Sequence, residues 1–247
     1  QNVFILTYLF DGQIQKYYYD LHSIKYRYLS VINDEYEGYK LVPYKNRIPY
    51  NKKELKDNID IYCGHLNKVG DYRNNLSKSW FEKAKNQDAV KQLKKNARNY
   101  FMNISKKTVN EVMWTTIRGE KDKRQKGKIE KKVCPSSYAN GFVPMTSRAT
   151  NKFKEKDCLA YLVNRFLNPI EKKFFEQYRV KVNESTWALS ELIQWVWRSR
   201  IRDGLPIQIY IPSKRMRDLL IQYLESEIFE EAPINAIVDE APSDWHL

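Results

Sequence analysis

Cysteine and histidine are scarce in this sequence of 247 residues. The three cysteines include no C-x-x-C pair, which argues against a disulfide framework and against a structural zinc site. The three histidines lie far apart and lack the spacing of metal ligands, so a metal-dependent hydrolase is not indicated. No G-x-S-x-G nucleophile elbow and no Cys-His signature occurs. We therefore expect no bound metal and a reducing compartment.

Long apolar stretches are missing as well. No run approaches the roughly 18 apolar residues that span a bilayer, and no signal peptide is visible at the start. These absences predict a cytoplasmic protein that does not enter a membrane. The chain begins at Gln1 without an initiator Met, which suggests a fragment cut from a larger protein.

Positive charge and aromatic rings are abundant instead. Lys and Arg outnumber Asp and Glu by 43 to 30, and 14% of the residues are aromatic. Cations combined with flat rings suit a polyanion whose bases can stack, so the composition favours single-stranded nucleic acid as a partner. The alternative is a soluble, Lys-rich protein whose composition reflects an AT-rich genome. Residues 218–247 hold eight acidic residues and no Lys or Arg, which predicts an acidic tail or linker.

Short apolar runs alternate with longer amphipathic stretches along the chain. We expect buried strands at residues 3–10, 59–63, 109–117, 141–145 and 207–211. We expect helices at residues 77–102, 158–167, 188–202 and 216–224. Such alternation is typical of an α/β fold in which a parallel sheet is covered by helices. We also expect an additional N-terminal or inserted segment beside this sheet.

A strongly basic stretch follows the strand expected at residues 109–117. Eight of the fifteen residues 118–132 are Lys or Arg, and two glycines interrupt any helix there. A solvated loop that contacts phosphate groups and a charged hairpin without a ligand are equally compatible with this pattern. The candidates for phosphate contacts are Arg118, Arg124, Lys126 and Lys128.

The segment from Gln194 to Arg202 carries the most specific pattern. On a helix, Gln194, Arg198 and Arg202 are four residues apart and share one face, and Arg200 lies between the two arginines. Arginine remains charged at any working pH, and its planar fork matches the oxygens of a phosphate group. The row therefore predicts contact with a phosphate-bearing ligand. An exposed basic face on a core helix is the alternative.

Together with Gly204 and the apolar strand expected at residues 206–211, this segment resembles the last conserved motif of superfamily 2 helicases of the DEAD/DEAH type. The resemblance extends to helicase-like proteins of bacterial phages and mobile elements, and it covers residues 141–224. It implies a RecA-like domain in which Gln194, Arg198 and either Arg200 or Arg202 face ATP across a cleft. The arginines would stabilise charge on the transferred phosphoryl group.

Residues 141–151 resemble the preceding strand-and-loop motif of the same helicases. In that family the motif contacts the nucleic-acid backbone and couples this contact to ATP. The resemblance implies that Thr146, Arg148, Thr150 and Asn151 bind the nucleic-acid strand.

The sequence contains no G-x-x-x-x-G-K-[ST] phosphate loop. We therefore expect ATP and Mg to be held mainly by an N-terminal RecA-like domain elsewhere in the full-length protein. Residues 1–140 would form the N-terminal part of an α/β domain with basic insertions, residues 141–224 the C-terminal motor half of a helicase or translocase, and residues 225–247 the acidic tail or linker. Two other functions stay open: a non-catalytic nucleic-acid-binding module of a phage or plasmid replication protein, and a nuclease or ribonuclease toxin.

Overall fold

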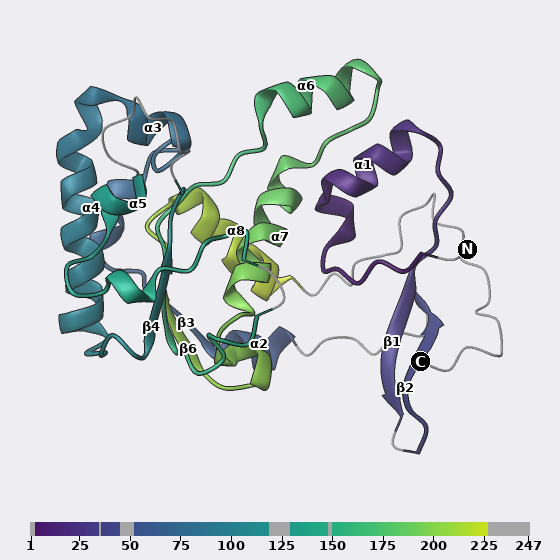
Figure 1. Cartoon of the computed structure of the whole chain (residues 1–247), viewed down its shortest axis with the longest axis horizontal. Helices are drawn as coiled ribbons and strands as arrows, with labels where there is room; N and C mark the ends of the chain where they lie inside the picture. Colours follow the sequence, from purple (N-terminus) through teal and green to yellow (C-terminus); the bar gives the residue numbers. More distant parts are fainter. Residues whose placement is uncertain (1–2, 35, 45–51, 119–128, 148–149, 227–247) are drawn as a thin grey trace.

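A four-stranded parallel sheet lies at the centre of the computed structural model, which describes residues 3–34, 36–44, 52–118, 129–147 and 150–226 (Figure 1). The strand order is β3-β6-β5-β4, and every neighbouring pair is parallel. The strands are β3 (Ile59–Ile61), β4 (Val112–Thr115), β5 (Cys158–Tyr161) and β6 (Ile207–Tyr210). Helices cover both faces, so the predicted α/β fold class is confirmed. Strands from both sides of residue 140 share this one sheet.

Side chains on the strands alternate between two hydrophobic cores. In β4, Val112 and Trp114 enter one core, whereas Met113 enters the other. In β5, Cys158 and Ala160 join the core of Val112, and the intervening residues join the core of Met113. This alternation follows from the two-residue period of a strand, and burial on both faces explains the continuous apolar composition of β5.

Two sets of helices cover the two faces, as Figure 1 shows. The face of Met113 is covered by α2 (Lys52–Asp57), α7 (Glu184–Val196) and α8 (Lys214–Glu225). The face of Val112 is covered by α3 (Lys78–Glu82), α4 (Gln87–Asn99) and α5 (Ile129–Val133). Short turns join these elements: η3 (His65–Gly70), η4 (Ala84–Asn86), the π-helical η5 (Tyr100–Ile104), η6 (Ala139–Gly141) and η7 (Arg200–Asp203).

Side-chain caps explain where several helices begin. Ser77, Asn183 and Ser213 each accept a hydrogen bond from a main-chain N–H in the first turn of α3, α7 and α8, respectively. Asn168 does the same for α6 (Pro169–Gln177), whose first residue is a proline. These polar residues therefore fix the helix starts.

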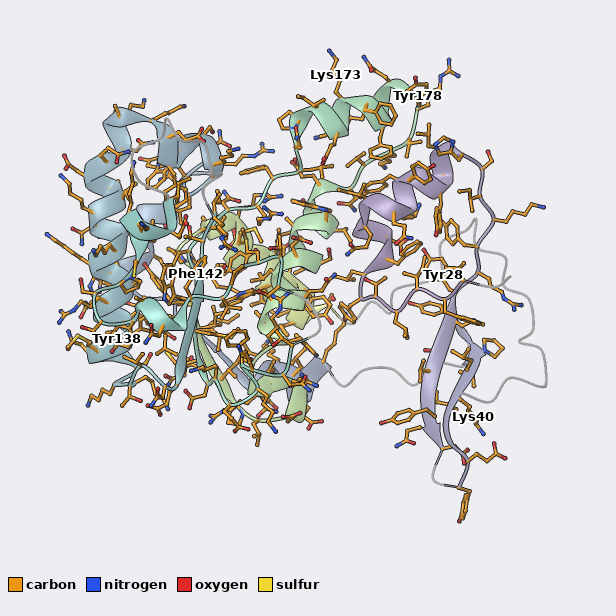
Figure 2. All side chains as sticks on the ribbon, in the orientation of Figure 1. Tyr28, Lys40, Tyr138, Phe142, Lys173 and Tyr178 are labelled. Atoms are coloured by element: carbon orange, nitrogen blue, oxygen red, sulfur yellow. The ribbon has the colours of Figure 1, made fainter. Side chains whose placement is uncertain are left out.

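The N-terminal part forms a small annex beside α6 and α7. It comprises η1 (Phe10–Gly12), α1 (Ile14–Leu21) and a hairpin of β1 (Leu29–Asp34) and β2 (Gly38–Pro43). Gly12 packs directly on the main chain of Thr186 and Trp187, where a Cβ atom would lie 2.7 Å from a backbone carbon. Figure 2 shows Tyr28 and Lys40 at the hairpin, away from Tyr138 and Phe142 beside the sheet. The annex is thus joined to the sheet domain through α7.

Several predicted elements are confirmed by these bounds. β3, β4 and β6 lie within the strands expected at residues 59–63, 109–117 and 207–211, and α8 covers the helix expected at residues 216–224. The stretch at residues 77–102, for which either one long helix or two helices were expected, contains the two helices α3 and α4.

Four predicted elements are wrong. The expected helix at residues 158–167 begins with strand β5, because a buried apolar run suits a central strand equally well. Residues 3–8 form no strand and are largely exposed, with Leu6 at 88%. At residues 141–145 only a single bridge joins Phe142 to Trp114. The helix expected at residues 188–202 ends at Val196.

None of the helices in the described part of the chain has the length and apolar character that a membrane crossing requires. The basic residues 119–128 and the acidic residues 227–247 lie outside the described residues.

Candidate functional site

The arginine segment does not continue as one helix. After α7 ends at Val196, Ser199 adopts an extended backbone, and the tighter turn η7 begins at Arg200. The Ser199 hydroxyl donates to the carbonyl of Val196, which helps to end the helix. The prediction that Gln194, Arg198 and Arg202 form a row on one helix face is therefore wrong.

Arg198 turns into the protein. Arg198 is only 8% exposed. Its Nη2 donates to the main-chain oxygen of Met145 at 3.2 Å and also to the main-chain oxygen of Ser147. The indole Nε1 of Trp195 donates to the carbonyl of Val143 at 3.1 Å. These hydrogen bonds fix the loop that follows Phe142 against the end of α7.

Arg202 lies at the surface next to the second half of the same loop. Its Nη1 donates to the side-chain oxygen of Asn151 at 2.8 Å, and its Nε lies 3.7 Å from the carboxylate of Asp203. Arg202 and Asn151 are both exposed. The two sequence segments that resemble helicase motifs are thus held together by direct hydrogen bonds.

The other predicted site residues are more scattered. Gln194 lies on α7, and its buried Nε2 has no hydrogen-bond partner within the described residues. Thr146 is exposed, and the hydroxyl of Thr150 accepts a hydrogen bond from the main chain of Lys152. Arg118 is exposed just beyond β4. Four predicted contacts lie outside the described residues: Arg124, Lys126, Lys128 and Arg148.

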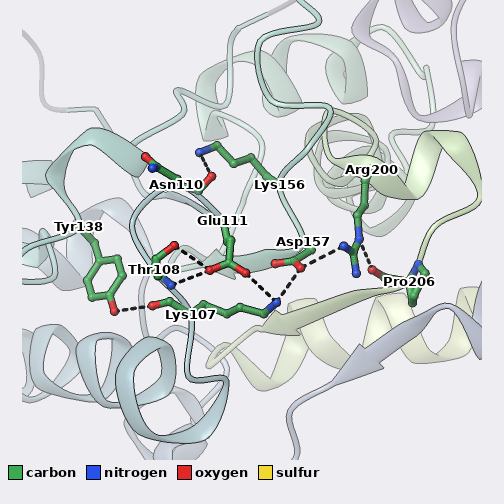
Figure 3. Close-up of polar contacts among 9 residues, drawn as sticks. All are labelled: Lys107, Thr108, Asn110, Glu111, Tyr138, Lys156, Asp157, Arg200 and Pro206. Atoms are coloured by element: carbon green, nitrogen blue, oxygen red, sulfur yellow. Dashed lines mark hydrogen bonds and ion pairs between the residues drawn. The ribbon is translucent and has the colours of Figure 1, made fainter.

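Arg200 belongs to an ion-pair network at the amino-terminal edge of the sheet (Figure 3). Asp157, which directly precedes β5, is 6% exposed, and its Oδ2 lies 2.7 Å from Lys107 Nζ and 3.0 Å from Arg200 Nη1. Arg200 Nε also donates to the carbonyl of Pro206 at 2.5 Å. The network joins the segments that lead into β4, β5 and β6.

Glu111 extends this network on its outer side. Its carboxylate accepts hydrogen bonds from the hydroxyl and the main-chain N–H of Thr108, and it lies 3.1 Å from Lys107 Nζ. The Thr108 hydroxyl, its N–H and Lys107 together lower the pKa of Glu111 to about 2. The hydrogen bond with Asp157 raises the pKa of Lys107. Glu111 and Lys107 are therefore both charged at neutral pH.

The carboxyl edge of the sheet carries a second set of cations, which sequence reasoning missed. Arg73 follows the β3 loop, Arg165 follows β5, and Arg215 and Arg217 lie in the first turn of α8. The signal available in the sequence was the helix cap Ser213 followed by three basic residues within four positions.

Topology makes this edge a place where ligands bind in related sheets. The adjacent strands β3 and β6 are followed by segments on opposite faces, α4 on one and α8 on the other. Ligands of open parallel sheets bind at such a switch point, at the carboxyl ends of the strands. Here the two loops touch, because a Cβ atom on Gly70 would lie 2.1 Å from the carbonyl oxygen of Pro212.

Possible metal ligands do not gather in either place. Within the described ranges, no group of three His, Cys, Asp or Glu residues could hold a metal ion.

The parallel order, the helices on both faces and the switch point define a Rossmann-like α/β domain. The chain belongs to the family of the YonV C-terminal Rossmann-like domain, whose model matches residues 53–224. It is 43% identical over 228 residues to the SPbeta prophage-derived uncharacterized protein YonV of Bacillus subtilis (strain 168). That match covers 92% of this chain and 53% of the relative, so the chain spans about half of the relative's length. No solved structure matches the chain significantly.

Proposed function

We propose that this domain binds single-stranded nucleic acid as the C-terminal half of a nucleic-acid motor of phage origin. The observation that supports the proposal best is the direct link between the two helicase-like segments. Arg198 binds the carbonyls of Met145 and Ser147, and Arg202 binds Asn151. A motor needs such a link, because a change at its nucleotide must alter its grip on the nucleic-acid strand.

The surface pair of Arg202 and Asn151 would make the contact with phosphate. Arg202 is held by a neutral amide and by a carboxylate of Asp203 at 3.7 Å, which leaves it accessible to a stronger anion. Arg198 is buried and satisfies main-chain carbonyls, so it would position the loop rather than touch the ligand. Arg200 would need to leave Asp157 before it could reach a nucleotide.

Overall charge would assist this binding. The chain has a formal charge of +13, which attracts a polyanion over long range and makes the affinity depend on salt. In the motor, ATP and Mg would be held mainly by another domain of a longer protein, because this chain has no phosphate loop.

Fluorescence anisotropy with a labelled single-stranded oligonucleotide tests the proposal. Arg202→Ala and Asn151→Ala should each weaken binding by about threefold to tenfold, as expected for one lost charge-assisted contact. Arg98→Ala is the matched control, because Arg98 is also exposed but lies on α4, across the sheet from α7. Equal affinities for all three variants and the wild type would exclude this site.

The internal position of Arg198 favours a second candidate, a non-catalytic nucleic-acid-binding module of a phage replication protein. In that case nucleic-acid binding would persist, but ATP would not change the affinity of the longer protein for the strand. A motor instead requires a change in affinity when ATP or its non-hydrolysable analogue is added. A cleavage assay with and without divalent metal separates both from a nuclease.

A further inference from the structure

Two arginines, Arg73 and Arg215, lie near each other at the carboxyl edge of the sheet. Within the described residues, neither Arg73 nor Arg215 has an acidic oxygen within 4.0 Å. Their neighbours Arg165 and Lys214, in contrast, pair with Glu191 at 3.2 Å and with Asp218 at 2.6 Å. The two unpaired guanidinium groups therefore stand out from the cations around them.

Arg215 is rigidly held. Its Nη1 donates to the side-chain oxygen of Asn164 at 3.1 Å and to the carbonyl of Arg165 at 2.6 Å, and the guanidinium stacks on Phe166 with 4.5 Å to the ring centroid. Its Nε and Nη2 have no hydrogen-bond partner in the described part of the chain. One side of the fork is thus fixed by the protein, and the other side remains available to an acceptor.

Asn164 brings Arg73 to the same place. Asn164 is 2% exposed. Its side-chain Nδ2 donates to the carbonyl of Arg73 at 2.7 Å and to the carbonyl of Asn75 at 3.1 Å. A single buried side chain therefore connects the loop after β3 to the first turn of α8. The guanidinium of Arg73 is exposed beside this connection.

The arrangement costs free energy in the absence of an anion. Burial lowers the pKa of Arg215, Glu184 opposes this effect, and the charge of Arg73 adds to the lowering. Burial thus disfavours the charged form of Arg215, and an anion bound at its guanidinium would offset that cost.

The start of α8 contributes further donors. Ser213 caps the helix through the N–H of Met216, so the main-chain N–H groups of Lys214 and Arg215 have no partner within the helix. α8 runs for 12 residues, and its dipole places positive charge at this end.

From these observations we infer a phosphate-binding site formed by Arg73, Arg215 and the first turn of α8. It shares no residue with the segments 143–151 and 194–202, so it goes beyond the function proposed above. The planar fork of Arg215 and the N–H groups of α8 match the oxygens of one phosphate group. Arg73, at the open side, would contact the same group or the next one along a strand.

The nucleic-acid backbone is one source of this phosphate, and a free nucleotide is the other. Binding of a labelled oligothymidylate tests the first source with the variants Arg73→Ala and Arg215→Lys, and with Arg98→Ala as the control of equal charge. Arg73→Ala should weaken binding by about fivefold to tenfold. Arg215→Lys should weaken it as well, because lysine keeps the charge but loses the fork.

A thermal unfolding measurement with inorganic pyrophosphate tests the second source. If the site holds a free phosphate, pyrophosphate should raise the Tm of the wild type and of Arg98→Ala, but not that of Arg73→Ala. In the described part of the chain, the hydrogen bond of Arg73 is made by its carbonyl, which alanine keeps, and the side chain lies near the like charge of Arg215. Arg73→Ala should therefore leave the Tm without ligand equal to or slightly above that of the wild type.

The results separate this site from the proposed function. A loss of oligonucleotide affinity in Arg73→Ala but not in Arg202→Ala supports the site and refutes the proposed contact at Arg202. If oligonucleotide affinity falls in Arg202→Ala alone and pyrophosphate does not raise the Tm, the site is overturned and the proposed function is still supported. The site is also overturned if Arg73→Ala and Arg215→Lys give the same oligonucleotide affinity and the same Tm shift with pyrophosphate as Arg98→Ala.

Discussion

Asp157 joins Lys107 and Arg200 at the amino-terminal edge of the sheet. The substitution Asp157→Asn keeps the shape of the side chain but removes the charge that Lys107 and Arg200 share. Hydrogen bonds to charged groups are worth about 1.5–3 kcal/mol each. The two partners keep other contacts, Lys107 with Glu111 and Arg200 with the carbonyl of Pro206, and their side chains are 24% and 30% exposed. We therefore expect a loss of about 2–3 kcal/mol in the free energy of unfolding.

Urea unfolding followed by tryptophan fluorescence measures this loss. A matched control is Asp88→Asn, because Asp88 pairs with Lys91 at 2.9 Å but its side chain is 94% exposed. That exposed pair should contribute little to stability, because water and salt screen it. Equal midpoints for the two variants would refute the view that the buried network holds the strand starts together.

Three further predictions concern stability. Glu111 has a folded pKa of about 2 against an ordinary 4.5, so its contribution is complete above pH 4.5 and disappears as the pH falls toward 2. In Glu111→Gln, the urea midpoint of unfolding should therefore fall less steeply than in the wild type as the pH is lowered from 4.5 toward 2. Gly70→Ala should cost about 2–3 kcal/mol in urea unfolding, because its Cβ would lie 2.1 Å from the oxygen of Pro212. Leu159→Ala, in the centre of the sheet, should cost about 3 kcal/mol, and a loss below about 1 kcal/mol would contradict its complete burial.

The strands and helices with clear local signals could be predicted from the sequence. β6 and α8 were predicted because an apolar run is followed by a short turn and then by an amphipathic pattern. β5 was mistaken for a helix because its buried apolar run has no period, and short runs of this kind fit both structures. The apolar residues 3–8 satisfied the strand pattern, but no neighbouring strand in the described residues pairs with them.

The candidate sites depend on contacts between distant residues, which a single sequence does not show. Asp157 and Arg200 meet only because β5 and β6 are neighbours in the sheet. Asn164 connects Arg73 and Arg215, which are even farther apart in the sequence than Asp157 and Arg200. The sequence singled out the arginine segment as a candidate site, but it did not show where α7 ends. The usual helix breakers Gly and Pro are missing there, and the helix ends instead before Ser199, which has an extended backbone.

The salt dependence of oligonucleotide binding tests the central claim most directly. The logarithm of the binding constant should fall linearly with the logarithm of the salt concentration. Replacing Arg202 by Ala should reduce the slope by about 0.7, the value for one phosphate contact on a single strand. Arg98→Ala should leave the slope of the wild type unchanged. Binding that does not change between low and high salt, or a slope that Arg202→Ala leaves intact, would contradict the account.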